Sequence, residues 1–215
     1  MARLPPGRHG LPREFVVSNQ RGRLSAGTIG AVVEHGYHET TVSRIVEAAG
    51  VSRRTFYQYF SSKEECFLDT YRVVEEFLLG EMRGAGEEVE ICLDRIRAEL
   101  AAGLAVFAAN PDLALFLFAT PQSAGGEVLD HYRTLLLKLR ELLKEGLDAR
   151  PVVRHPGDTI DDGLAGGIAS LIVRAVRAGD GPGLGLRLDE ILELVLAPYL
   201  GREAAAAAVG ELASS

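Results

Sequence analysis

The chain has 215 residues, of which 47% are hydrophobic and 7% aromatic, and its formal net charge is -7. This length and apolar content are sufficient for one or two domains with a buried core, which excludes a disordered tail. The apolar stretches are shorter than the roughly 20 residues of a membrane-spanning helix, and the arginine-rich N-terminus lacks an apolar secretory segment. We therefore expect a cytoplasmic protein that has no membrane partner and is not exported.

The charge is unevenly distributed along the chain. Residues 1–63 carry nine basic and four acidic residues, a net charge of +5, which leaves -12 for the rest. A basic first part and a larger acidic second part are typical of a protein whose first part binds a polyanion. The alternative is that the charge of solvent-exposed surfaces varies along the chain without any functional reason. Residues 1–13 contain three prolines and two glycines among arginines, and they predict a flexible basic arm.

After this arm, apolar residues recur at helical spacing and strand-like alternation is hard to find. We therefore predict an all-α fold of about nine or ten helices. The clearest apolar stripes run through residues 67–78, 96–107, 128–142, 160–175 and 188–199. Breakers separate the predicted helices, and they include His35-Gly36, Gly50, Gly84 to Gly86, Asn110-Pro111 and Pro121 to Gly126.

The segment 40–63, TTVSRIVEAAGVSRRTFYQYFSSK, predicts two short helices around a tight break. Thr41 is placed to cap the first helix and Ser52 the second, and Gly50 supplies the left-handed turn between them. This is helix-turn-helix chemistry, in which the second helix enters the major groove of DNA. Acidic residues are absent from Ala48 to Lys63, as suits a surface that approaches phosphates.

Residues from about 21 to 71 resemble the DNA-binding domain of the TetR family of transcriptional regulators. The resemblance rests on a Gly-Tyr pair, a Thr-Thr-Val start, an Ala-Gly-Val-Ser turn, a Thr-Phe-Tyr recognition core and a Phe-x-Ser-Lys-Glu exit, all within HGYHETTVSRIVEAAGVSRRTFYQYFSSKEECFLDTY. It implies a three-helix DNA-binding head, which we place at 14–63 after the arm at 1–13. It also implies a helical effector-binding and dimerisation body, which we place at 64–215, and a homodimer.

By the family pattern, DNA contacts fall on the turn and on the recognition helix. The residues that would touch phosphates are Thr41, Ser52, Tyr57 and Lys63. The residues nearest the bases would be Arg53, Arg54, Thr55 and Gln58. Arg44 and Tyr59 complete the predicted DNA-binding set, whereas Phe56 and Phe60 are expected in the core because their i, i+4 spacing puts them on the inward face.

The sequence also departs from the family pattern. Arg54 stands where the family often has Gly and Tyr59 where it often has His, so the operator sequence cannot be transferred from a relative. The first helix contains Gly27 and Gly30, and a glycine in a helix interior costs about 1 kcal/mol relative to alanine. We therefore expect this helix to depend unusually on packing.

Aromatic and polar residues on consecutive helices of the body suit an apolar pocket with a few polar anchors. The predicted ligand-binding residues are Phe107, Phe116, Phe118, Gln122, His131, Tyr132 and Arg174. The alternative is that the aromatic residues are ordinary core. We expect a hydrophobic or amphipathic small-molecule effector and neither a metal nor an organic cofactor.

Small residues in the eighth predicted helix, around 160–175, permit close helix approach, and the ninth, around 188–199, carries a wide apolar stripe. These features predict a two-fold homodimer built from the two helices. The resulting hypothesis is a repressor that an effector releases from a double-stranded DNA operator. The alternative is an all-α enzyme whose helix-turn-helix merely packs against its body. The sequence contains no recognisable catalytic constellation, so we do not expect an enzyme.

Overall fold

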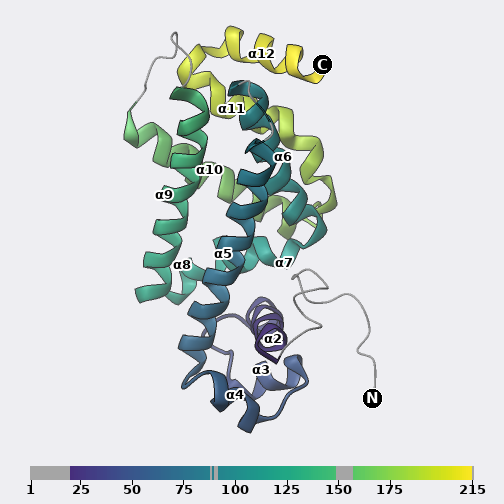
Figure 1. The fold of residues 1–215 in the computed structure, drawn as a ribbon, viewed down its shortest axis with the longest axis vertical. Coiled ribbons are helices and arrows are strands. Elements are labelled where there is room, and N and C mark those ends of the chain that lie inside the picture. The colour runs from purple at the N-terminus through teal and green to yellow at the C-terminus, as the bar shows by residue number, and fades with distance from the viewer. Residues whose placement is uncertain (1–19, 88, 90–91, 149–156, 215) are drawn as a thin grey trace. The chain divides into compact units, whose positions relative to one another are not determined.

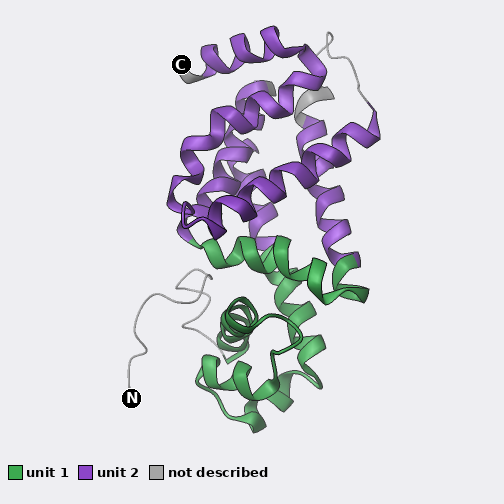
Figure 2. Ribbon diagram, turned by 180° about the vertical axis from the view of Figure 1, so that it is seen from behind, with its two compact units in different colours: residues 1–75, 110–129 green, residues 76–109, 130–215 purple. Residues whose placement is uncertain are grey.

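The computed structural model describes residues 20–87, 89, 92–148 and 157–214, which form helices and turns without a strand (Figure 1). The all-α prediction is confirmed for this part of the chain, and the predicted arm at 1–13 lies outside it. Contacts divide the protein into one unit of residues 1–75 and 110–129 and another of residues 76–109 and 130–215 (Figure 2). Among the described residues, no single helix is long and apolar enough to cross a membrane. Taken together, Leu93–Ala109 and Pro111–Ala124 reach that length and composition, but a bend of 110° separates them.

The first unit consists of short helices around a small core. Its elements are α2 (Gln20–His35), α3 (Val42–Ala49), α4 (Arg53–Tyr59), the beginning of α5 (Lys63–Glu87), α7 (Pro111–Ala114), the π-helical η1 (Leu115–Ala119) and α8 (Thr120–Ala124). Leu24, Ile45, Phe56, Phe60 and Cys66 are buried in one hydrophobic cluster. The prediction that Phe56 and Phe60 belong to the core is confirmed.

Gly27 lets α2 and α3 pack closely together. A Cβ atom at this position would lie 2.7 Å from the backbone nitrogen of Ala49 and 2.7 Å from the carbonyl oxygen of Ile45. Since these are backbone atoms, no rotamer change makes room for a side chain. The close approach leaves no room for a larger residue at position 27, and the dependence of this helix on packing stays a prediction.

Residues 110–124 pack on the core of the first unit through aromatic rings. The ring of Phe116 lies 4.8 Å from that of Phe67 and 6.0 Å from that of Tyr71, measured between centroids. The Tyr71 hydroxyl donates a hydrogen bond to the carbonyl oxygen of Leu117 at 3.0 Å. Tyr37, on the turn after α2, adds an edge-on contact with Phe67 at 4.9 Å. Segments far apart in sequence thus form one compact unit.

The second unit is a set of longer helices. Its elements are the rest of α5, α6 (Cys92–Ala109), most of α9 (Gly126–Asp148), α10 (Asp158–Arg177), the 3-10 helix η2 (Pro182–Arg187), α11 (Leu188–Leu200) and α12 (Arg202–Ser214). The helix η2 packs against α6 and α11, and α12 packs against α11. An ion pair between Arg97 of α6 and Asp189 of α11, at 2.6 Å, adds to this packing.

The predicted break at Gly84 to Gly86 is wrong, because α5 continues without interruption to Glu87. Gly86 is buried against the side chain of Glu99 on α6, with no room for a Cβ atom. Tertiary packing here offsets the glycine penalty of about 1 kcal/mol that the sequence alone suggests.

Candidate DNA-binding surface

Three local caps build the turn between α3 and α4. Thr41 Oγ1 accepts a hydrogen bond from the Arg44 amide at 3.3 Å, and Ser52 Oγ accepts one from the Thr55 amide at 3.0 Å. Gly50 ends α3 in the left-handed conformation, with φ of 61°. The Val51 amide then donates to the Val46 carbonyl at 3.0 Å, which turns the chain sharply toward α4. These caps match those predicted for a helix-turn-helix.

Arg23 of α2 holds the same turn from outside. Its Nε donates to the Ala49 carbonyl at 3.1 Å and its Nη2 to the Gly50 carbonyl at 2.6 Å. A cation at the end of a helix satisfies carbonyls that lack partners within the helix. Sequence reasoning missed this role, since Arg23 counted only toward the basic total. The spacing between an arginine and a helix end 26 residues later carries no local signal.

The outer face of α4 presents hydrogen-bond donors to solvent. Tyr57 is 54% and Tyr59 44% exposed, and Arg53, Arg54 and Gln58 are also exposed. Arg54 and Gln58 stand four residues apart, which places them on one face of the helix. Among the described residues, Arg53 Nη1 makes only a long hydrogen bond of 3.4 Å, to Ser43 Oγ. Phe56, on the opposite face, is fully buried and fixes which side of α4 faces outward.

Lys63 is occupied by the protein itself. Its ammonium donates to the carbonyls of Tyr37, His38 and Thr40 at 3.1, 3.3 and 2.9 Å, and it lies 5.0 Å from the centroid of the Tyr37 ring. An ammonium has three N–H donors, so all three are used. The side chain therefore fastens the start of α5 to the segment between α2 and α3. Contact with a phosphate would require Lys63 to give up one of these carbonyls.

Arg44 and Glu65 are also engaged within the first unit. Arg44 Nη1 donates to the Glu39 carbonyl. The Glu65 carboxylate accepts hydrogen bonds from the Ser61 hydroxyl and amide, each at 2.6 Å, and these bonds hold the pKa of Glu65 below its ordinary value. Of the basic residues in the predicted DNA-binding set, Arg53 and Arg54 keep the most freedom to meet DNA.

The comparisons with known proteins agree with this geometry. The family described as bacterial regulatory proteins, tetR family, matches residues 26–70, which include α3, α4 and the turn between them. The HTH-type transcriptional regulator TcmR of Streptomyces glaucescens is 37% identical over 87 residues, which make up 40% of this chain and 38% of TcmR. A TetR family transcription regulator from Marinobacter aquaeolei VT8 has a TM-score of 0.68, with 17% identity, over 84% of this chain and 95% of that one. Residues 26–70 therefore form a TetR-type DNA-binding domain.

Over more than four fifths of its length, the chain is similar in fold to solved structures. The fatty acid degradation regulator FadR from Bacillus halodurans has a TM-score of 0.73 at 21% identity, over 83% of this chain and 95% of that one. FadR from Bacillus subtilis, solved with stearoyl-CoA, has a TM-score of 0.70 at 19% identity, over 82% and 97%. The sequence match spans about two fifths of the length of the first curated relatives, 38% of TcmR and 40% of the activator FasR of Mycolicibacterium smegmatis.

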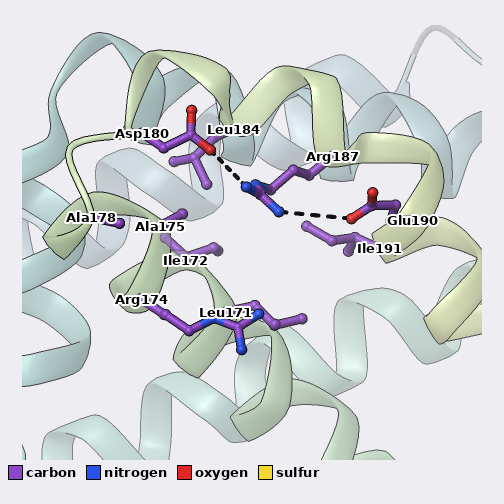
Figure 3. A pocket seen from close by; sticks show the side chains of 10 residues that line it. All are labelled: Leu171, Ile172, Arg174, Ala175, Ala178, Asp180, Leu184, Arg187, Glu190 and Ile191. Carbon is purple, nitrogen blue, oxygen red and sulfur yellow. Dashed lines mark hydrogen bonds and ion pairs between the residues drawn. The ribbon is translucent and has the colours of Figure 1, made fainter.

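The predicted ligand residues of this chain do not line one described pocket. Phe116 and Phe118 are buried in the first unit, where Phe116 contributes to the aromatic core, and Gln122 is exposed there. In the second unit, Phe107 and Tyr132 are buried, His131 is half-buried and Arg174 is exposed. Arg174 alone of the seven lines the described pocket, which lies between α10, η2 and α11 (Figure 3).

Proposed function

We propose that this TetR-family protein represses transcription by binding a double-stranded DNA operator through the outer face of α4. The observation that carries the proposal is the row of exposed donors on α4, which follows a turn that Arg23 holds through the carbonyls of Ala49 and Gly50. A fixed turn matters because side chains must reach base edges with small positional error. Arg53, Arg54, Thr55 and Gln58 read bases, and Thr41, Ser52, Tyr57 and the amides of the first turn of α4 meet phosphates.

The protein acts as a homodimer through α10 and α11, in the cytoplasm. Gly163, Gly166 and Gly167 of α10 support this, because no atom of another described element lies within 4 Å of a Cβ atom built on any of them. Ile160 of α10 is 43% exposed and Leu194 of α11 is 40% exposed, and a partner would cover both. Two heads then engage half-sites about 34 Å apart or a multiple of that distance.

A hydrophobic or amphipathic small molecule releases the repressor from DNA. Relatives support this. FadR of Bacillus subtilis was solved with stearoyl-CoA. A fatty acid metabolism regulator protein of the same organism is 24% identical over 145 residues, which cover 61% of this chain and 74% of that protein. The relative AcnR of Corynebacterium glutamicum is named a repressor. An effector that favours a body conformation with different head spacing must weaken DNA binding, and DNA must weaken effector binding equally.

The test begins with selection of duplexes that the full chain binds, followed by titrations with variants. Arg53→Ala and Arg54→Ala should each weaken the selected operator by about 1 to 3 kcal/mol per head and relax preference at one position. Arg72→Ala is the matched control, because Arg72 is exposed on α5 within the same unit but outside α4. If both α4 variants bind as tightly as the wild type, α4 is not the reader. If no duplex is selected, the enzyme alternative gains weight.

A further inference from the structure

Arg54 and Gln58 lie at the centre of the outer face of α4. An α-helix turns by about 100° per residue, so each of the two stands about 160° from Phe56, which lies between them in the sequence. Phe56 is fully buried and belongs to the hydrophobic cluster of the first unit. Arg54 and Gln58 are both exposed. The two side chains therefore leave the helix on the side opposite its core contact.

Arg53 and Thr55 lie nearer the edges of the same face, and both are engaged by neighbouring side chains. Around the helix axis, Arg53 stands about 60° and Thr55 about 100° from Phe56. Arg53 Nη1 donates to Ser43 Oγ of α3 at 3.4 Å, and the Thr55 hydroxyl shares a hydrogen bond of 2.9 Å with Ser52 Oγ. These contacts draw the two side chains toward the turn and away from the centre of the face.

The side chains of Arg54 and Gln58 make no hydrogen bond or ion pair with another described residue. A guanidinium group offers two parallel N–H donors, which match the O6 and N7 acceptors of guanine in the major groove. A glutamine amide offers one donor and one acceptor, which match N7 and the N6 amino group of adenine. The two side chains are therefore complementary to different bases.

We propose that Arg54 and Gln58 determine the operator sequence, with Arg54 bound to a guanine and Gln58 to an adenine two base pairs away in each half-site. The spacing follows from the helix, because four residues rise by about 6 Å and two base-pair steps span about 7 Å. A helix that lies along the groove brings both side chains to base edges at once. The inference rests on the proposed function, in which α4 enters the major groove, and it adds which bases are read.

The competing role for Arg54 is a phosphate contact. Such a contact would add affinity without base preference, since every sequence offers the same phosphates. The major groove is about 12 Å wide, close to the diameter of a helix with its side chains. The edges of a helix in this groove consequently face the phosphates, and the centre of its outer face meets the bases. The central position of Arg54 favours guanine.

The test starts from duplexes that the full chain selects from a random library, and it replaces single bases of the selected operator by 7-deaza analogues. These analogues keep Watson–Crick pairing but lack the N7 acceptor. Wild type should bind about tenfold more weakly with 7-deazaguanine at the predicted guanine and about threefold more weakly with 7-deazaadenine at the predicted adenine, since only the first loses a hydrogen bond to a charged group. Arg54→Ala should become insensitive to 7-deazaguanine but stay sensitive to 7-deazaadenine, and Gln58→Ala should show the reverse.

A change of specificity gives a second readout that loss of folding cannot imitate. In a new selection, Arg54→Gln should prefer adenine where the wild type prefers guanine, and the adenine assigned to Gln58 should remain. Arg72→Gln is the matched control, because Arg72 is exposed on α5 in the same unit but outside α4, and it should select the wild-type sequence.

The outcomes separate this inference from the proposed function. The inference alone is overturned if a half-site is selected without a guanine and an adenine two base pairs apart, or if Arg54→Ala stays as sensitive to 7-deazaguanine as the wild type. It is also overturned if Arg54→Ala weakens all duplexes alike and makes the slope of log affinity against log salt concentration shallower by about one per head, as a phosphate contact would. If the chain selects no duplex at all, the proposed function fails and this inference fails with it.

Discussion

Replacing Gly27 by alanine tests whether close packing of α2 on α3 supports the DNA-binding head. The added Cβ atom would lie 2.7 Å from two backbone atoms of α3 and 2.8 Å from Ala49 Cβ, whereas ordinary contact begins at 3.4 Å. The two helices must therefore separate by about 0.7 Å. Overpacking costs up to about 3 kcal/mol, and the better helix propensity of alanine returns about 1 kcal/mol. The expected net loss of stability is about 2 kcal/mol.

For a chain of this length, that loss corresponds to a Tm lower by about 4 to 8 °C. The measurement is thermal unfolding followed by circular dichroism, together with titration of the selected operator. DNA binding should also weaken for every sequence, because α3 carries the turn that positions α4. Gly80→Ala is the matched control: Gly80 lies on α5, and no atom of another described element lies within 4 Å of a Cβ atom built on it, so the same change should stabilise by about 0.5 to 1 kcal/mol. Equal or opposite effects at the two glycines would refute the packing argument.

Three further predictions follow from the engaged side chains and the open face of α10. Lys63→Met should destabilise the first unit and weaken binding to all duplexes alike. The slope of log affinity against log salt concentration should stay as in the wild type, because the three N–H donors of Lys63 already bind carbonyls, whereas a slope shallower by about one would show a phosphate contact. Burial raises the pKa of Glu99, whose Oε2 has no hydrogen-bond partner among the described residues. The free energy of unfolding should therefore fall as the pH rises from the ordinary pKa of a glutamate through the raised pKa, and Glu99→Gln should flatten this pH dependence, measured by urea titration from pH 4 to 8. Gly167→Glu should convert the dimer to a monomer in light scattering, and a monomeric wild type at micromolar concentration would contradict the assembly.

The sequence by itself determined the fold class and the helix-turn-helix. The hydrogen bonds of helix caps join residues three or four positions apart, so the spacing of Thr41, Gly50 and Ser52 is enough to predict the turn. The apolar faces of α3 and α4 follow from helical periodicity, which is also local. Burial of Phe56 and exposure of Arg54 could be predicted for this reason.

Only the tertiary structure decided which polar groups were already occupied. Lys63 and Arg23 bind carbonyls that lie 23 to 27 residues away along the chain, and nothing in the local pattern indicates those partners. Phe116 likewise became core when α7 and η1 packed on Phe67 and Tyr71. The pocket at Arg174 depends on how η2 folds back after Gly179. A helical pattern specifies which residues share a face, whereas the partner of that face is chosen by packing between distant segments.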